Sequence, residues 1–396
     1  MSSPLPDGAA RRALLLGVFG FVVLGMTDGA LGVVWPDLRD EFDRSDGSFG
    51  QVFVCLAGGY MLASFASGHL SDRYGVTAVV RGGSTLAALA LAVIATGASW
   101  PVTLAGFLLL GLGNGLLDAT VNAWVAIKQT QRAMGLLHGF YGIGAVAGPL
   151  VATAFVANDD RWQVPFWIFA TLQIAVLVAL PQARAGFDDA PVTADVEAAQ
   201  EHVASGSARL LPMVLAWFFL YVGAEVAIGQ WSFTLLTEQR DVADQTAGIL
   251  VATYWGGLTA GRFLLAAVGD RMTPELMMSR ASALAVAGAT VFAIDPGGFG
   301  AAGLPVLGFA FSVMFPAVVN RTPVYLGAAR AARVVGYQFA ASSAGAIVIP
   351  SLIGILIDRS SAEALATVSL AVVIAMTAMW AVVRAGAPKP TTTPAS

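Results

Sequence analysis

The feature that most constrains this chain is the recurrence of apolar segments about 20 residues long, separated by short polar links. A helix of that length spans the hydrocarbon core of a bilayer. Only 12% of the residues are charged, against roughly 25% in soluble domains, so water is not the main solvent. The sequence therefore predicts an all-α membrane protein. Its twelve predicted transmembrane helices span 13–34, 49–70, 78–97, 101–127, 134–157, 162–181, 210–236, 246–268, 274–294, 302–325, 334–357 and 363–384.

The basic residues predict the orientation of these helices. An even number of spans places both termini on one side of the membrane. With the termini inside, fifteen of the 21 lysine and arginine residues fall on the cytoplasmic side and five outside, while Arg262 lies within the helix 246–268. Because cytoplasmic loops are enriched in basic residues, we expect a multi-pass protein of the cytoplasmic (inner) membrane with both termini in the cytoplasm.

The chain divides into two similar halves. The longest polar stretch is acidic and separates the predicted helices six and six, so we expect a bundle over 1–181, a cytoplasmic linker over 182–209 and a second bundle over 210–396. Internal duplication of this kind is typical of transporters whose site lies between the repeats near the middle of the membrane. A shift of 198 residues superimposes Gly50 on Gly248, Phe65 on Phe263 and Asp72 on Asp270, and a shift of 201 superimposes Arg132 on Arg333, Gly144 on Gly345 and Pro149 on Pro350.

Several classes of function are disfavoured by what the sequence lacks. The single cysteine, Cys55, has no partner, which leaves no thiolate metal site, and we expect neither a metal nor a cofactor. No basic stripe with interleaved aromatic residues indicates nucleic-acid binding. The phosphate-binding Gly-x-x-x-x-Gly-Lys-Ser/Thr loop is absent, as are His-Glu-x-x-His and Gly-x-Ser-Gly. We expect no catalytic residues and no enzyme, and a non-transporting membrane sensor is a remote alternative.

The segment Gly68-His69-Leu70-Ser71-Asp72-Arg73-Tyr74-Gly75 resembles the signature Gly-x-x-x-Asp-Arg-x-Gly of the major facilitator superfamily. The family usually follows it with two basic residues, where this chain has Val76 and Thr77. The resemblance implies the major facilitator fold, with two pseudo-symmetric six-helix bundles that rock to expose a central cavity alternately to each side. It also implies a cytoplasmic gate, for which the candidates are Gly68, Asp72, Arg73, Gly75, Arg81, the second copy at Asp270 and Arg271, and Arg262.

A narrower resemblance lies in the helix 101–127. The stretch Gly111-Leu-Gly-Asn-Gly-Leu-Leu-Asp118-Ala-Thr-Val-Asn122 is similar to the fourth helix of fucose permease-like sugar:proton symporters, which also place an aspartate late in the first helix, where this chain has Asp28. The resemblance implies a proton-coupled carrier for a small polar solute such as a sugar.

Three acidic residues lie within apolar helices. A charged carboxylate at the bilayer centre costs roughly 2.5–3.5 kcal/mol on insertion scales, so such residues normally face a cavity. The candidates for carrying protons are Asp28, Asp118 and Glu225. Each can also be read as an acid that only bonds a neighbouring helix. His138 is a fourth candidate, although a lone histidine is as often an interface residue.

A sugar would need amide groups for its hydroxyls and aromatic faces for its ring. Glu225 and Gln230 are five residues apart, about 140° around a regular helix, so we expect them to share a face only if that helix is broken. The candidate substrate-binding residues are Asn114, Asn122, Tyr141, Gln230, Trp231, Tyr254, Trp255 and Gln338.

The sequence therefore favours a monomeric secondary transporter in the lipid bilayer, which imports a small solute together with protons. An exporter of drugs or metabolites with the same fold is the main alternative. It is favoured by Gly144-x-x-x-Gly148-Pro149, which resembles the glycine-proline motif of drug:proton antiporters, although close helix packing explains that motif equally well.

Overall fold

The computed structural model describes residues 8–159, 161–187, 210–268, 272–326 and 331–386. These ranges contain twelve long helices and no strand, joined by short 3-10 and π-helical turns. The helices are α1 (Gly8–Glu41), α2 (Phe49–Tyr74), α3 (Val76–Ala95), α4 (Trp100–Lys128), α5 (Gln131–Asp159), α6 (Gln163–Phe187), α7 (Leu211–Thr234), α8 (Asp244–Val268), α9 (Pro274–Ile294), α10 (Gly303–Leu326), α11 (Ala331–Arg359) and α12 (Ala364–Gly386).

Each predicted helix is present, but several are longer than the apolar runs that predicted them. The first helix extends to Glu41 instead of ending at residue 34, and α6 continues to Phe187, past the predicted start of the linker at 182. Apolar runs mark the part of a helix inside the bilayer, whereas backbone hydrogen bonding continues into polar residues beyond it. The rest of the predicted linker, 188–209, lies outside the described residues.

Eleven of the helices in the described ranges are long and apolar enough to cross a membrane. The exception is α8, which carries Arg262 along with Tyr254, Trp255 and several glycines. A helix that lines a polar cavity and packs closely against others needs less apolar surface than one that faces lipid.

The two halves repeat the same close helix contacts. A side chain at Gly59 in α2 would strike the backbone carbonyl of Leu108 in α4, and one at Gly257 in α8 would strike that of Pro305 in α10. Contacts at such small residues let helix backbones approach closely, which is how helices pack in a membrane. The internal repeat in the sequence therefore corresponds to a repeat of these helix–helix contacts.

The glycines of the antiporter-like motif serve the same purpose. Side chains at Gly144 and Gly148 in α5 would meet the backbone carbonyls of Val22 and Met26 in α1. Packing of α5 against α1 accounts for this motif, so it no longer favours export over import.

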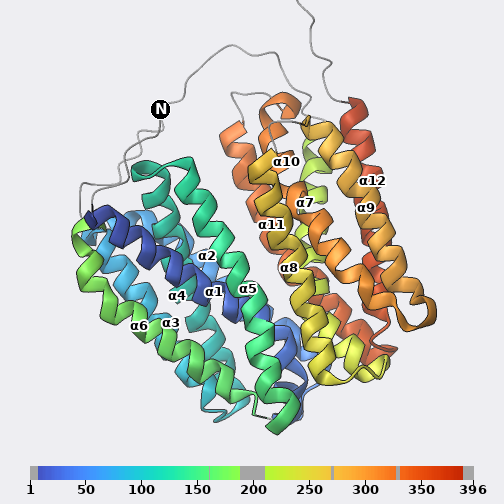
Figure 1. Ribbon diagram of the computed structural model, residues 1–396, viewed down its shortest axis with the longest axis horizontal. Coiled ribbons are helices and arrows are strands. Elements are labelled where there is room, and N and C mark those ends of the chain that lie inside the picture. Colours follow the sequence, from blue (N-terminus) through green and yellow to red (C-terminus); the bar gives the residue numbers. More distant parts are fainter. Residues whose placement is uncertain (1–7, 160, 188–209, 269–271, 327–330, 387–396) are drawn as a thin grey trace, which may run out of the picture.

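Figure 1 shows α1–α6 and α7–α12 as two bundles that meet in their lower part and diverge toward the top. The start of α1 and the end of α12 lie at the upper end of the picture, which we call the terminal side, and the lower end is the far side. Consecutive helices therefore cross the molecule in alternating directions.

The seam between the bundles is closed unevenly. Between α5 and α8, Gly142 contacts Thr259 and Gly248 contacts Thr153, so these two helices touch over much of their length. Between α2 and α11, Gly50 contacts Ser351 near the far side. Toward the terminal side the same two helices expose large side chains, with Phe65 82% and Tyr337 48% exposed. The bundles are thus closed together at the far side.

Candidate functional site

A cavity of about 300 Å³ lies between the two bundles, within the range of roughly 300–1,000 Å³ typical of small-molecule sites. Both halves contribute to its wall, through α1, α2, α4 and α5 on one side and α7, α8 and α11 on the other. The lining is mainly apolar. Its polar and aromatic members are Asp28, Tyr60, Asn114, Tyr141, Glu225, Gln230, Trp255, Arg262 and Ser343.

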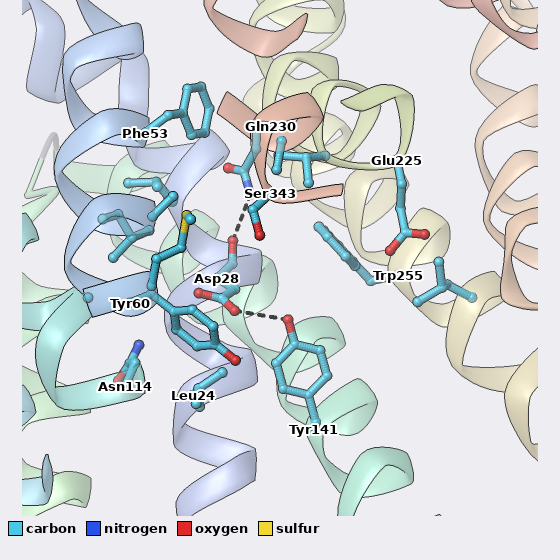
Figure 2. Close-up of a pocket in the computed structure, with 18 of the residues that line it drawn as sticks. Leu24, Asp28, Phe53, Tyr60, Asn114, Tyr141, Glu225, Gln230, Trp255 and Ser343 are labelled. Atoms are coloured by element: carbon cyan, nitrogen blue, oxygen red, sulfur yellow. Dashed lines mark hydrogen bonds between the residues drawn. The ribbon is translucent and has the colours of Figure 1, made fainter. Parts of the chain in front are cut away.

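Asp28 lies at the centre of the site, in contact with both bundles (Figure 2). Within the first bundle, Tyr141 Oη of α5 donates a 2.9 Å hydrogen bond to Asp28 Oδ2. From the second bundle, Gln230 Nε2 of α7 donates a 2.9 Å bond to the backbone carbonyl of Asp28. Glycines on both sides of Asp28 allow this approach, because a side chain at Gly32 would strike the backbone of Gln230. One residue of α1 is thereby tied to both halves.

The second bundle contributes an ion pair to the same cavity. Arg262 Nη2 of α8 lies 3.9 Å from Glu225 Oε1 of α7, and Tyr221 Oη donates to the other carboxylate oxygen of Glu225. Tyr254 Oη donates to the backbone carbonyl of Glu225 at 2.8 Å. Arg262 therefore lines the cavity and pairs with Glu225. Asp270, another candidate for the gate, lies outside the described residues.

Glu225 and Gln230 both line this cavity although α7 is continuous through them. The expectation concerned a shared face of the helix, and the unbroken α7 instead directs the two side chains toward different neighbours, α1 and α8. The helix wall presents a wide face to the cavity, with Gln230 on the side of α1 and Glu225 on the side of α8, as Figure 2 shows.

Two polar atoms of the cavity wall are buried without a hydrogen-bond partner in the described structure. They are Gln230 Oε1, an acceptor, and Trp255 Nε1, a donor, on side chains that are each 5% exposed. A buried polar group left unpaired costs about 1–3 kcal/mol, so native proteins rarely keep one without a reason. Neither atom is open to water in this conformation, so a solute with hydroxyl groups, which both donate and accept, would satisfy this pair as the side chains turn toward it.

Asp118 lies behind the cavity wall. Tyr60 Oη of α2, which lines the cavity, donates to Asp118 Oδ2, and Asn122 Nδ2 donates to Asp118 Oδ1 at 3.1 Å. Asp118 therefore contacts the cavity through Tyr60, and the predicted Asn122 supports Asp118 instead of lining the site. Asn114, one turn before Asp118, does line it.

Four other predicted residues lie away from the cavity wall. Trp231 Nε1 donates to the backbone carbonyl of Pro350, and Gln338 is fully buried in a bond with Thr322 between α11 and α10. Tyr254 supports Glu225 from behind. His138 lies edge-on to Phe21, with ring centres 6.0 Å apart. Among the described residues no group of three or more histidine, cysteine or acidic side chains could hold a metal ion.

The signature motif lies at the terminal side, where α2 ends at Tyr74 and α3 begins at Val76. Gly75 joins them with a φ of 84°, a conformation that suits glycine. Asp72, Arg73 and Arg81 are exposed there, and the Arg73 guanidinium lies 5.3 Å from the centre of the Tyr74 ring. Gly68 is open to solvent, and Arg271, like Asp270, lies outside the described residues. In this conformation Asp72 makes no ion pair within the described part of the chain.

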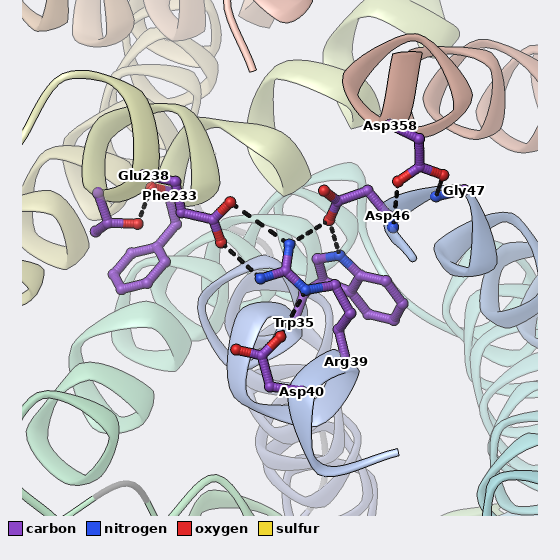
Figure 3. A network of polar contacts seen from close by, with 9 residues as sticks. Trp35, Arg39, Asp40, Asp46, Gly47, Phe233, Glu238 and Asp358 are labelled. Carbon is purple, nitrogen blue, oxygen red and sulfur yellow. Dashed lines mark hydrogen bonds and ion pairs between the residues drawn. The ribbon is translucent and has the colours of Figure 1, made fainter. Parts of the chain in front are cut away.

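The far side of the cavity is closed by aromatic side chains and then by a polar network (Figure 3). Trp35, Phe49 and Trp231 pack together beneath the cavity, with the rings of Trp35 and Phe49 stacked at 4.2 Å. Beyond them lies the far-side network, which comprises Arg39, Asp46, Glu238 and Asp358.

The far-side network crosses the seam twice. Arg39 at the end of α1 binds Asp46 at 2.8 Å within its own bundle and Glu238 of the second bundle at 2.9 Å. Asp358 at the end of α11 accepts the backbone N–H groups of Asp46 and Gly47 at 2.7 and 2.8 Å. These contacts stabilise the conformation in which the far side is closed.

Loss of one cross-seam contact should open the far side measurably. A cysteine reporter is made by Phe53→Cys, on the cavity wall nearest the aromatic side chains, in a Cys55→Ser background. We expect Glu238→Gln to raise its labelling by a membrane-impermeant maleimide from the far side up to about fivefold, since exposed ion pairs contribute about 0.2–1 kcal/mol. The matched control, Glu41→Gln, removes an exposed acid at the end of α1, the helix that carries Arg39. Equal labelling in both variants would mean that the ion pair does not hold the far side closed.

Sequence reasoning missed Tyr60, Ser343 and the whole far-side network. Tyr60 stands alone in an apolar helix, and its only signal is that it follows Gly59 in a chain with just seven tyrosines. The partners that the network joins across the seam are separated by about 200 to 300 residues, so no local pattern connects them.

Comparisons with known proteins agree with this architecture. A model of the Major Facilitator Superfamily matches residues 17–337. The chain is 29% identical over 282 residues to "Bypass of stop codon protein 6" of Saccharomyces cerevisiae, covering 63% of this chain and 56% of that protein. It is 23% identical over 272 residues to the glucose/mannose transporter GlcP of Bacillus subtilis, covering 66% and 67%. It is 24% identical over 275 residues to the glucose/galactose transporter of Brucella abortus, covering 63% and 64%. The chain thus spans roughly 56–67% of the length of these relatives.

Two solved structures share the fold. The nucleoside transporter NupG matches with a TM-score of 0.74 at 13% identity, over 94% of this chain and 99% of that one. FucP, a major facilitator transporter solved in the outward conformation, matches with a TM-score of 0.60 at 17% identity, over 93% and 98%. The predicted fold class is confirmed. Two of the three relatives are named as transporters, in agreement with the prediction that the chain is not an enzyme.

Proposed function

The chain belongs to the Major Facilitator Superfamily, and we propose that it is a proton-coupled symporter of a small, uncharged polar solute such as a sugar. One observation carries this proposal. The wall of a single cavity contains both an unpartnered acceptor, Gln230 Oε1, and an unpartnered donor, Trp255 Nε1. Hydroxyl groups of a solute can donate a hydrogen bond to Gln230 Oε1 and accept one from Trp255 Nε1. Relatives that are sugar transporters support the same solute class.

The charges in the cavity support an uncharged solute. Arg262 is already paired with Glu225, so it offers no free cation for an anionic solute. Asp28, which has no basic partner within the described residues, is the group we assign to the proton. Removing an ionised carboxylate from water is costly, and a bound proton removes that cost when the cavity closes on both sides.

Coupling would follow from the position of Asp28 between the bundles. Its side chain is bonded to α5 of the first bundle, and its backbone carbonyl to α7 of the second. Solute held by Gln230 and Trp255 therefore lies next to the proton site. Proton and solute would cross together as one bundle rocks against the other.

We further assign the terminal side to the cytoplasm, from the distribution of basic residues. The conformation described here, closed at the far side, is then the inward-facing one. The bundle boundaries of 1–181 and 210–396, the monomeric state and the inner-membrane location form part of the same proposal.

The function is tested with purified protein in liposomes that have an alkaline interior. We expect radiolabelled glucose, galactose, mannose or fucose to accumulate inside, and a protonophore to release it. Accumulation that survives the protonophore would contradict proton coupling, and no accumulation of any of these sugars would contradict the solute class. Empty liposomes provide the baseline.

The role of Trp255 is tested by Trp255→Phe, which keeps the aromatic face but removes the unpartnered N–H group. We expect the half-saturation concentration of the solute to rise about tenfold, because one hydrogen bond is lost. Thermal stability should stay the same or increase, since a buried unpaired donor is removed. The control is Trp217→Phe, at a buried tryptophan of α7 that does not line the cavity. It should lower stability and leave half-saturation unchanged. If Trp255→Phe instead lowered thermal stability and left the half-saturation concentration unchanged, Trp255 would be a packing residue.

A further inference from the structure

A groove of about 530 Å³ lies between α9 and α12, away from the transport cavity. These two helices form the outer edge of the second bundle in Figure 1. One wall comes from Ser279, Ser282 and Ala283 of α9, and the other from Thr377, Ala381 and Arg384 of α12. None of its residues lines the cavity, so its occupant is not the transported solute.

The end of the groove nearest the terminal side is polar and positively charged. Arg384 belongs to the last turn of α12, and its Nη1 donates to Ser279 Oγ at 3.2 Å. A guanidinium group beside a hydroxyl is the chemistry that binds phosphate.

A second hydroxyl of the groove points to a ligand independently of this charge. Ser282 lines the groove and is only 5% exposed as a residue, yet its hydroxyl makes no hydrogen bond within the described chain and is not among the unpartnered atoms that are sealed from water. Serines inside helices usually donate to a backbone carbonyl one turn earlier, as Ser279 does to Glu275. Ser282 therefore offers a donor to the same groove, one helical turn from Ser279, the residue that Arg384 contacts.

The remainder of the groove suits an acyl chain. Beyond Arg384 its walls are Ala283, Ala381 and Trp380, and both alanines are exposed at the surface. Because α9 and α12 are long enough and apolar enough to span a membrane, this surface faces lipid. A site with a phosphate-binding end at the membrane boundary and an apolar extension has the shape of a phospholipid.

We propose that this groove binds an anionic glycerophospholipid, with the phosphate on Arg384 and Ser282 and an acyl chain along Ala283 and Ala381. A headgroup such as phosphocholine carries its own cation, which competes with Arg384 for the phosphate. Phosphatidylglycerol has no such cation, so the groove selects it. The bound lipid bridges α9 and α12 and stabilises the second bundle.

The experiment titrates the purified, detergent-solubilised full chain with dioleoyl-phosphatidylglycerol, dioleoyl-phosphatidylcholine or inorganic phosphate. Thermal stability and lipid-bound mass are both measured. We expect phosphatidylglycerol alone to raise the melting temperature and to appear as a bound species. In Arg384→Gln its affinity should fall about fivefold, the contribution of one arginine near a lipid surface. The matched control, Arg359→Gln, removes an exposed arginine at the far-side end of α11 and should bind as the unaltered chain does.

A second variant keeps the test decisive if Arg384→Gln folds poorly. Ala381→Trp fills the apolar part of the groove from an exposed position and should also displace the lipid. Equal stabilisation by phosphatidylcholine, equal stabilisation by inorganic phosphate, or unchanged phosphatidylglycerol binding in the folded variants would each overturn the proposal.

Discussion

Vesicles that carry Asp28→Asn are expected to lose concentrative uptake entirely, down to the level of vesicles without the protein. Asparagine keeps the size of the side chain and can still bond Tyr141, but it cannot take up and release a proton. Because the proposed solute contacts are Gln230 and Trp255, binding itself should survive. Exchange of labelled for unlabelled solute without a proton gradient should therefore continue.

The measurement compares proton-driven accumulation with this exchange in the same vesicles. Glu41→Gln is the control, since it removes an exposed carboxylate at the far-side end of the same helix that lies outside the far-side network. Asp118→Asn should have a smaller effect than Asp28→Asn, because Asp118 contacts the cavity only through Tyr60. Normal accumulation by Asp28→Asn would remove this residue from the coupling mechanism.

The second large effect concerns Gly32, where α1 meets the backbone of Gln230 in α7 across the seam. A side chain at this position collides with backbone, so Gly32→Val should prevent the far side from closing. We expect the Phe53→Cys reporter to be labelled from the far side to near completion and transport to stop. The protein should still fold, because this contact lies between the bundles and not within one.

Gly25, two turns earlier on α1, provides a matched comparison. A side chain there would strike the backbone of Tyr141 in α5, inside the first bundle. Gly25→Val should therefore reduce folded protein in the membrane, since packing within a bundle is lost, without producing far-side labelling of the protein that remains. If both variants behave alike, the seam is not where the molecule opens.

The helices and their repeat could be predicted from the sequence, because lipid imposes long apolar segments and close contacts at small residues. The acids could also be found in the sequence, since a carboxylate such as Asp28 is conspicuous among apolar neighbours. The sequence did not show which of these acids lines the cavity directly. Asp28 and Asp118 have similar local surroundings in sequence, and only the position of Tyr60 between Asp118 and the cavity distinguishes them.

The amides and aromatic residues were harder to place because they serve packing as readily as binding. Gln230 lines the cavity, whereas Gln338, expected to act with it, is buried against Thr322. Trp255 lines the cavity, but Trp231 joins the aromatic residues that close it below. In each pair the residue types are identical, and the rotation of the helix about its axis decides the outcome.

The cavity wall has a consequence for the energy source of transport. Its described acidic and basic side chains are two carboxylates, Asp28 and Glu225, and one guanidinium, Arg262, so a single proton on Asp28 makes the wall electrically neutral. If an uncharged solute crosses with that one proton, every cycle carries one positive charge across the membrane. Membrane voltage then drives the cycle directly, contributing about 2.3 kcal/mol per 100 mV, even where the pH is equal on both sides.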